Sequence, residues 1–192
     1  TGTTLESDAN LTVANTVAIT GTGTVDTNGN ALTLSGVVSG GTLAKTDTGT
    51  LVLSGANTYT GGTTLSGGTI QVGSNTALGT GALAMASGTT LDAGTADRTL
   101  ANAVAITGTS TVDTNTGKTL TLGGVVSGSG TLTKIDSGTL LLSGANTYTG
   151  GTTLSGGTIQ VGTNTALGTG ALAMAADTTL KSGANNLTDR KS

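Results

Sequence analysis

Short runs in which apolar and polar residues alternate recur along the whole chain. Typical runs are Leu32-Thr33-Leu34 and Ile70-Gln71-Val72, while Leu51-Val52-Leu53 is a related run that is apolar throughout, and Gly, Ser, Asn or Asp separates nearly all of them. Alternation of this kind, in residues rich in Thr, Val, Ile and Leu, predicts short β-strands. No stretch keeps apolar residues at helical spacing over four turns, and the two glycines in 77–86 argue against a helix there.

The runs recur at a regular spacing. Their last apolar residues lie 19 residues apart in one series, and 20, 19 and 19 residues apart in a second, namely Leu34, Leu53, Val72 and Leu91, then Leu122, Leu142, Val161 and Leu180. A sandwich or barrel does not require such a period, and a propeller needs blades of about 40 to 50 residues. We therefore predict an all-β fold, a right-handed parallel β-helix (β-solenoid). It has roughly nine coils of about 19–22 residues each and is on the order of 45 Å long.

A longer repeat lies on top of this period. The sequence GANTYTGGTTLSGGTIQVG occurs at 55–73 and again, unchanged, at 144–162. Upstream of these segments the offset between the copies falls from 89 to 87 residues, because the copies differ by single-residue insertions at Asn28-Gly29-Asn30 and at Gly40-Gly41, where copy two is one residue longer each time. Insertions collect where a chain turns, so we predict loops at both places.

The repeats predict one continuous body rather than separate domains. Residues 1–192 form a single β-helix segment, with copy one at about 3–91, copy two at about 89–180, and a partial coil or disordered tail over 181–192. A solenoid needs caps on its terminal coils. Neither end of this sequence looks like a cap, so we expect an internal stretch of a longer protein.

Composition supports the solenoid and excludes several functions. Pro is absent, as expected where strands pair on both edges, and Trp and Phe are absent, as expected in a narrow aliphatic interior. The absence of Cys and His excludes disulfides, zinc enzymes and Ser-His-Asp hydrolases. A net charge of −3 gives no basic surface for nucleic acid, and no apolar run is long enough to insert into a membrane.

Two 32-residue stretches carry a family resemblance. Residues 42–73 read TLAKTDTGTLVLSGANTYTGGTTLSGGTIQVG, and 131–162 repeat the pattern with few changes. Both resemble the autotransporter-associated β-strand repeat, also called the passenger-associated transport repeat. The matching positions are Lys45, Asn57, Tyr59 and Gly61 in copy one, and Lys134, Asn146, Tyr148 and Gly150 in copy two. The sequence departs from the family at Asp47 and Asp136, where Gly is frequent, and at Ile70 and Ile159, where Leu is commoner.

The resemblance implies a non-enzymatic stalk segment of a secreted or surface-displayed type V autotransporter passenger. Its role would be secretion and folding, with adhesion or cell–cell aggregation. Its partners would be its own translocator β-barrel, neighbouring coils of the full-length chain, and surface glycans or proteins or other copies of itself. Its place would be the extracellular cell surface, with outer-membrane anchoring through a domain outside this stretch. Export through a pore also gives the absence of Cys a reason, because a periplasmic disulfide would obstruct it.

Individual residues suggest no chemistry, and we predict no catalytic residue, metal ligand or cofactor. The ten carboxylates are mostly isolated beside Gly, Thr or Asn and are interpreted as turn formers. Lys45 and Lys134 are expected to be solvated surface charges. Tyr59 and Tyr148 are expected to pack over a coil edge with their hydroxyls in water.

Two other functions stay open at this level. A carbohydrate-active β-helix enzyme fragment requires carboxylates that converge in one groove. An ice-binding Thr-array solenoid requires Thr-x-Thr pairs on consecutive coils of one face. Such pairs occur, among other places, at 22–24, 48–50, 58–60 and 109–111.

Overall fold

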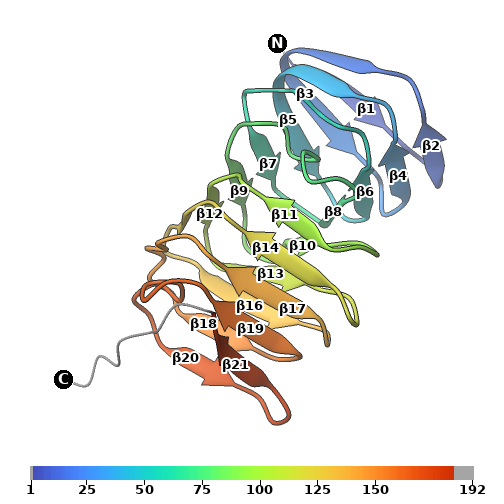
Figure 1. Ribbon diagram of the computed structural model, residues 1–192. Helices are drawn as coiled ribbons and strands as arrows, with labels where there is room; N and C mark the ends of the chain where they lie inside the picture. The colour runs from blue at the N-terminus through green and yellow to red at the C-terminus, as the bar shows by residue number, and fades with distance from the viewer. Residues whose placement is uncertain (1, 184–192) are drawn as a thin grey trace.

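The computed structural model describes residues 2–183, and in them the chain winds into a β-solenoid whose strands pair in parallel (Figure 1). Within these residues there is no helix, and so none that could cross a membrane. The expected all-β parallel solenoid is confirmed. Its long sheet has nine strands, one per coil, which agrees with the predicted number of coils.

Three parallel sheets form the faces of the solenoid. The first sheet has seven strands, β1 (Thr3–Glu6), β3 (Val17–Asp26), β5 (Val38–Thr46), β7 (Thr63–Leu65), β9 (Leu83–Met85), β12 (Val104–Ile106) and β15 (Val126–Ser127). The second has nine, β2 (Leu11–Val13), β4 (Ala31–Leu34), β6 (Thr50–Leu53), β8 (Thr69–Val72), β10 (Thr90–Asp92), β13 (Thr109–Asp113), β16 (Thr131–Ile135), β18 (Thr152–Leu154) and β20 (Leu172–Met174). The third has five, β11 (Arg98–Leu100), β14 (Thr119–Leu122), β17 (Thr139–Leu142), β19 (Thr158–Val161) and β21 (Thr179–Ser182).

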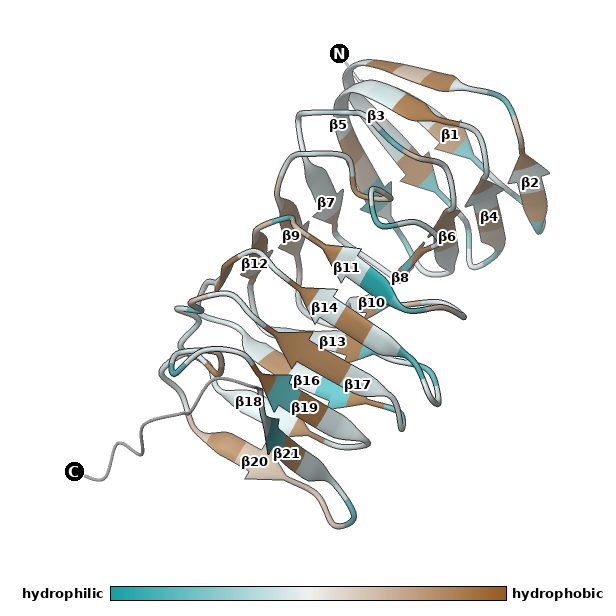
Figure 2. Cartoon of the chain, in the orientation of Figure 1, coloured by the Kyte–Doolittle hydropathy of each residue, from teal (hydrophilic) through white to brown (hydrophobic). Residues whose placement is uncertain are grey.

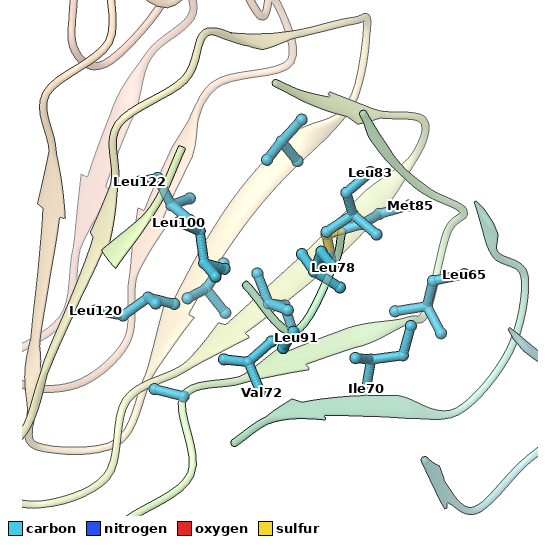
Figure 3. Packing of buried hydrophobic residues seen from close by; sticks show 14 of the residues in the cluster. Leu65, Ile70, Val72, Leu78, Leu83, Met85, Leu91, Leu100, Leu120 and Leu122 are labelled. Atoms are coloured by element: carbon cyan, nitrogen blue, oxygen red, sulfur yellow. The ribbon is translucent and has the colours of Figure 1, made fainter. Parts of the chain in front are cut away.

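The interior is a stack of aliphatic side chains. Along β4, β6 and β8 every second residue is buried, and each of these inward residues is Leu, Ile or Val. Figure 2 shows hydrophobic bands on strands of all three sheets. Leu34 lies beside Leu53, and Leu53 beside Val72, in register on successive coils. Figure 3 shows Val72, Leu91 and their neighbours pointing into this shared core.

The predicted 19-residue series is wrong at its last step in each copy. Leu91 lies beside Ile70 rather than Val72, and Leu180 lies beside Ile159 rather than Val161. The coil that leads to Leu91 contains an additional turn closed by a hydrogen bond from the Ala77 amide to the Ser74 carbonyl. This turn buries Leu78 and lengthens the coil, so the register moves by two residues.

One predicted loop is confirmed and the other is wrong. Asn28-Gly29-Asn30 is a turn, in which the Asn30 amide donates to the Thr27 carbonyl. Gly40-Gly41 instead lies inside β5, where the pairing with β3 shifts register between Ile19 and Thr22. A Cβ on Gly40 would lie 2.1 Å from the Ile19 carbonyl oxygen, so the backbones approach too closely for a side chain.

The two copies of the repeat do not occupy the same faces. In copy one β7 belongs to the first sheet and β8 to the second, whereas their counterparts β18 and β19 belong to the second and third sheets. Along the ladder of the second sheet, four coils lead from Thr50 to Thr133, which lies 83 residues later. The position in copy two that is equivalent to Thr50 in sequence is Thr139, which lies beyond Thr133 on the same coil. Copy two therefore begins about a third of a coil further round, and β11 opens the third sheet at this junction (Figure 1).

Candidate functional site

The lysine of each repeat is buried and binds backbone carbonyls at a corner. Lys45 Nζ donates to the carbonyl oxygens of Thr46, Asp47 (2.9 Å) and Thr48 (3.3 Å). Lys134 Nζ donates to Ile135 (2.6 Å), Asp136 (2.7 Å) and Gly156 (3.3 Å). Both side chains are 0% exposed, so the expected solvated surface charge is wrong. Each ammonium group instead donates its hydrogen bonds to carbonyl oxygens of the corner, which take the place of water molecules.

Burial and neighbouring charges act on these lysines in opposite directions. Burial lowers the pKa of Lys134 to about 8, and the carboxylates of Asp113 and Asp136 oppose that shift. Burial likewise lowers the pKa of Lys45, against the carboxylates of Asp26 and Asp47. The ion is thus held by carbonyl oxygens and by nearby carboxylates rather than by solvent.

The corner that each lysine binds contains an aspartate in the left-handed region. Asp47 has φ 58° and Asp136 has φ 60°, a conformation that Gly, Asn and Asp adopt most readily. Each carboxylate accepts a hydrogen bond from the next residue's amide, at 2.7 Å from Thr48 and 2.6 Å from Ser137. This geometry explains why Asp can replace the Gly that is frequent in the family here.

The asparagine of each repeat bridges three consecutive coils. Asn57 Oδ1 accepts from the amide of Val38 on the preceding coil (2.8 Å), and its Nδ2 donates to the carbonyl of Ala77 on the following coil (2.7 Å). Asn146 makes the same two bonds, to Val126 (2.7 Å) and Ala166 (2.6 Å). Both side chains are buried, so each asparagine pairs backbone groups that no strand ladder satisfies.

The tyrosines are also internal, which corrects the expected exposed hydroxyl. Tyr59 is 0% exposed, and its hydroxyl shares a hydrogen bond of 2.7 Å with Thr63 Oγ1 and donates to Ala77 O at 3.3 Å. Burial raises the pKa of Tyr59 to about 12, although the bond to Thr63 lowers it. Tyr148 is equally buried and pairs with Thr152 Oγ1 at 2.6 Å. The interior therefore accepts a phenol ring where a buried threonine satisfies its hydroxyl.

Gly61 and Gly150 let the chain pass closely over the coil before them. A Cβ on Gly61 would lie 2.4 Å from Thr42 Oγ1, and one on Gly150 would lie 2.5 Å from the Gly130 backbone.

In copy one the asparagine and the tyrosine both donate a hydrogen bond to the same carbonyl oxygen, Ala77 O. The lysine lies apart from them, at its own corner. We refer to these buried polar contacts of Lys, Asn and Tyr as the repeat network.

The network differs between the copies at one threonine. Thr27 Oγ1 donates to the Thr48 carbonyl at 2.6 Å, the same carbonyl that Lys45 binds. Its counterpart Thr114 is also fully buried, but its Oγ1 has no hydrogen-bond partner, and the same holds for Asp113 Oδ1. Burial raises the pKa of Asp113, and the carboxylates of Asp92 and Asp136 add to the rise.

Some of the carboxylates serve turns, as the sequence indicated, and some join neighbouring coils. Asp26 Oδ1 accepts from the Asn28 amide (3.0 Å), and Asp97 Oδ1 from the Thr119 amide (2.8 Å). Asp92 accepts from the Gly94 amide through one oxygen (2.7 Å) and from Gln71 Nε2 through the other (2.7 Å). Asp92 and Asp113 are neighbours in the ladder, yet residues 2–183 contain no group of three or more acidic residues arranged to hold a metal ion.

The outer faces carry threonines in single file. Six coils in a row of the second sheet present an outward Thr at the same position, namely Thr50, Thr69, Thr90, Thr111, Thr133 and Thr153. The neighbouring outward row is mixed and includes Val52, Gln71 and Asp92. Of the Thr-x-Thr pairs named above, 22–24 lies in the first sheet and 109–111 in the second, so these pairs do not lie on one face.

Sequence reasoning missed the burial of the lysines and tyrosines. A signal for the lysines was present, because Leu43 and Lys45 are two residues apart in one strand and so face the same side. Leu132 and Lys134 repeat this spacing. No comparable signal marks the tyrosines, which lie in a connection between strands.

Comparison with known proteins supports the family that the repeats suggested. The passenger-associated-transport-repeat family matches residues 43–72 and again residues 132–161. No curated protein and no solved structure matches the chain. The two matched segments contain all eight of the Lys, Asn, Tyr and Gly positions described above. This family implies a protein that is secreted or exposed at the cell surface.

Proposed function

We propose that this autotransporter passenger segment, a β-solenoid with two passenger-associated transport repeats, is a structural stalk. It supports secretion by folding coil upon coil outside the cell, and it performs no catalysis of its own. The passenger belongs to a type V system and is anchored at the outer membrane through its translocator β-barrel. Its long sides provide a surface for adhesion or cell–cell aggregation.

The repeat network is the observation that carries this proposal. Asn57 can satisfy both of its hydrogen bonds only when the preceding and the following coil are in place, because Val38 and Ala77 lie on opposite sides of it. A coil that has just folded therefore offers unpaired polar groups to the next one. Such an arrangement favours growth from one end, as expected for a chain that leaves a pore in order.

The character of the sides supports adhesion. Charged residues make up only 9% of the chain, and the outward Thr row of the second sheet repeats over six coils. A long, repetitive and weakly charged side can make many small equivalent contacts with a surface glycan, a surface protein or a like rod.

Export tests the stalk proposal. The chain is fused to an autotransporter translocator, and surface-exposed, protease-resistant product is measured after a pulse-chase. The Asn57→Ala/Asn146→Ala variant should accumulate less product, whereas Asn75→Ala, at an exposed position, should behave as the unaltered chain. Equal yields of resistant product from all three chains would show that the network does not support secretion.

A second export experiment tests the reason given for the absence of Cys. Ala84 and Ala105 are directly paired on adjacent strands, so cysteines at these positions can form a disulfide in the folded chain. Export of Ala84→Cys/Ala105→Cys should fall under oxidising conditions and recover with reductant. Undiminished export of the oxidised chain would sink the idea.

Cell binding tests the adhesion part on its own. Cells that display the chain should sediment together or bind a surface faster than cells that display the translocator alone. If the two cell types behave alike, the segment is a stalk without adhesive function.

A further inference from the structure

One turn of the solenoid contains an asparagine followed directly by a glycine. Asn28 and Gly29 are the central residues of the turn in which the Asn30 amide donates to the Thr27 carbonyl at 2.7 Å. Both are exposed and have positive φ, 45° at Asn28 and 79° at Gly29, as in the turn type that Asn-Gly prefers. Asn28 is the only asparagine of the chain that a glycine follows.

The backbone nitrogen of Gly29 is accessible. Within residues 2–183 the Gly29 amide donates no hydrogen bond to the protein. A Cβ on Gly29 would meet only Thr48 Oγ1, at 3.6 Å, so the space around the residue is open. Glycine also has no side chain of its own to obstruct a close approach of its backbone to the preceding side chain. The nitrogen can therefore reach Asn28 Cγ when the exposed turn rotates.

We propose that Asn28 is a site of spontaneous modification, at which the Gly29 nitrogen displaces ammonia from the side-chain amide. A bond forms between Gly29 N and Asn28 Cγ, and the bond from Cγ to Nδ2 breaks. The amide proton of Gly29 leaves with Nδ2 as ammonia. Water then opens the cyclic succinimide at either carbonyl and yields aspartate or isoaspartate. Water from the solvent is the only co-reactant, and the product adds one negative charge to a chain of net charge −3.

Copy two contains an asparagine at the equivalent position that should react far more slowly. Asn115 also reaches the preceding coil, where its Nδ2 donates to Gly94 O at 2.7 Å and to Asp92 Oδ1 at 3.2 Å. The residue after it is Thr116, whose β-branched side chain hinders the approach of its own amide to the asparagine side chain. The two copies thus place a reactive turn and a hindered turn in one molecule.

The modification removes a contact between successive coils. Asn28 Nδ2 donates to Asp8 Oδ1 on the preceding coil at 2.8 Å, and the Asn28 amide donates to Asp26 Oδ1 at 3.0 Å. A carboxylate at position 28 cannot donate to Asp8, and it adds a like charge beside both aspartates. Isoaspartate also adds a carbon to the backbone within the turn. The product therefore weakens the attachment of the 27–30 turn to the coil before it.

Peptide mapping by mass spectrometry tests the modification. The folded chain is incubated at mildly alkaline pH and sampled over days. Product that is about one mass unit heavier should accumulate at Asn28 as aspartate and isoaspartate. Its rate should exceed that at Asn115 by at least about tenfold. Asn28→Gln, whose longer side chain would have to close a larger ring, should give no product at this position. Thr116→Gly should make Asn115 reactive.

The same incubation in urea, where the chain is unfolded, measures the intrinsic rate at each asparagine. If Asn28 is intact in the folded chain when the unfolded chain has fully reacted, the fold protects it and the proposal is wrong. Equal rates at Asn28 and Asn115 in the folded chain would also overturn it.

Hydrogen exchange tests the effect on the coils. The Ser7 amide donates to the Asp26 carbonyl at 3.0 Å, next to the contact that the modification removes. Exchange at Ser7 should be faster in Asn28→Asp and should recover in Asp8→Asn/Asn28→Asp, because donor and acceptor have then changed places. Unchanged exchange in Asn28→Asp would show that the contact does not hold the coil. Neither experiment bears on export, which tests the stalk proposal separately.

Discussion

The ammonium group of Lys134 lies 2.7 Å from the carbonyl oxygen of Asp136, a residue that the corner holds at φ 60°. This bond makes a buried cation part of the turn rather than a surface charge. Lys134→Met keeps the length of the side chain but leaves the carbonyls of Ile135, Asp136 and Gly156 without this donor. We expect a loss of about 1–3 kcal/mol in unfolding free energy, measured by urea denaturation. Lys181→Met, at an exposed position, should cost far less, and equal losses would contradict the role of the corner.

The lowered pKa of Lys134 also predicts how the stability of the folded chain depends on pH. Burial lowers the pKa of Lys134 to about 8, below the ordinary value of 10.5 expected in the unfolded chain. Between these values the unfolded chain binds the proton and the folded chain has released it, so the unfolding free energy rises with pH. The stability of the unaltered chain relative to Lys134→Met should therefore increase from pH 8 to pH 10.5. A flat or falling difference across this window would show that the folded chain keeps the proton.

The asparagine bridge should be more important than a surface amide. Asn57→Ala leaves the Val38 amide and the Ala77 carbonyl buried without this partner, at an expected cost of about 2–4 kcal/mol. Asn75→Ala removes one bond at an exposed position, to the Thr99 amide, and should cost less than about 1 kcal/mol. Thermal unfolding of the two variants measures the difference. Similar melting temperatures would mean that water replaces Asn57.

Two equivalent threonines should respond in opposite ways to the same substitution. Thr27→Val removes a bond of 2.6 Å to the Thr48 carbonyl and should destabilise by about 1 kcal/mol. Thr114→Val removes a buried hydroxyl that has no partner and should be neutral or stabilising. Both variants keep a β-branched side chain, so each is the steric control for the other. The prediction fails if both lose stability equally in chemical denaturation.

The direction of each side chain should decide whether a charge is tolerated. Leu53→Asp and Leu142→Asp place a carboxylate in the core at a cost of several kcal/mol, and should block folding. Val52→Asp lies one residue away but faces outward, so this variant should fold. Limited proteolysis distinguishes the outcomes. A protease-resistant product from Leu53→Asp would contradict the assignment of Leu53 to the interior.

The architecture could be predicted from the sequence because it depends on local alternation and on a period. Leu34, Leu53 and Val72 stack as their spacing indicated, since each step is an uninterrupted coil. The spacing failed at Leu91 because a buried turn at Ala77 and Leu78 adds residues that no period reveals. Gly40-Gly41 was expected to form a loop because insertions usually do, and instead it allows close backbone contact within a strand.

The repeat network could be located from the sequence but not described. The family resemblance identified Lys45, Asn57 and Tyr59 as positions, without saying which way they point. A lysine is seldom buried, so its usual preference outweighed the inward alternation with Leu43. Its burial depends on carbonyls that the left-handed Asp47 turns toward the ammonium group, and these become visible only in three dimensions.

The offset between the copies has a consequence for any longer array of the same repeat. Thr50 and Thr139 are equivalent in sequence, but Thr50 belongs to the second sheet and Thr139 to the third. With the same junction repeated, each further copy would turn about the long axis by about a third of a circle. Three copies in succession would then present the same residues in three different directions. A rod of this kind has no preferred side, so a binding partner could approach it from any direction.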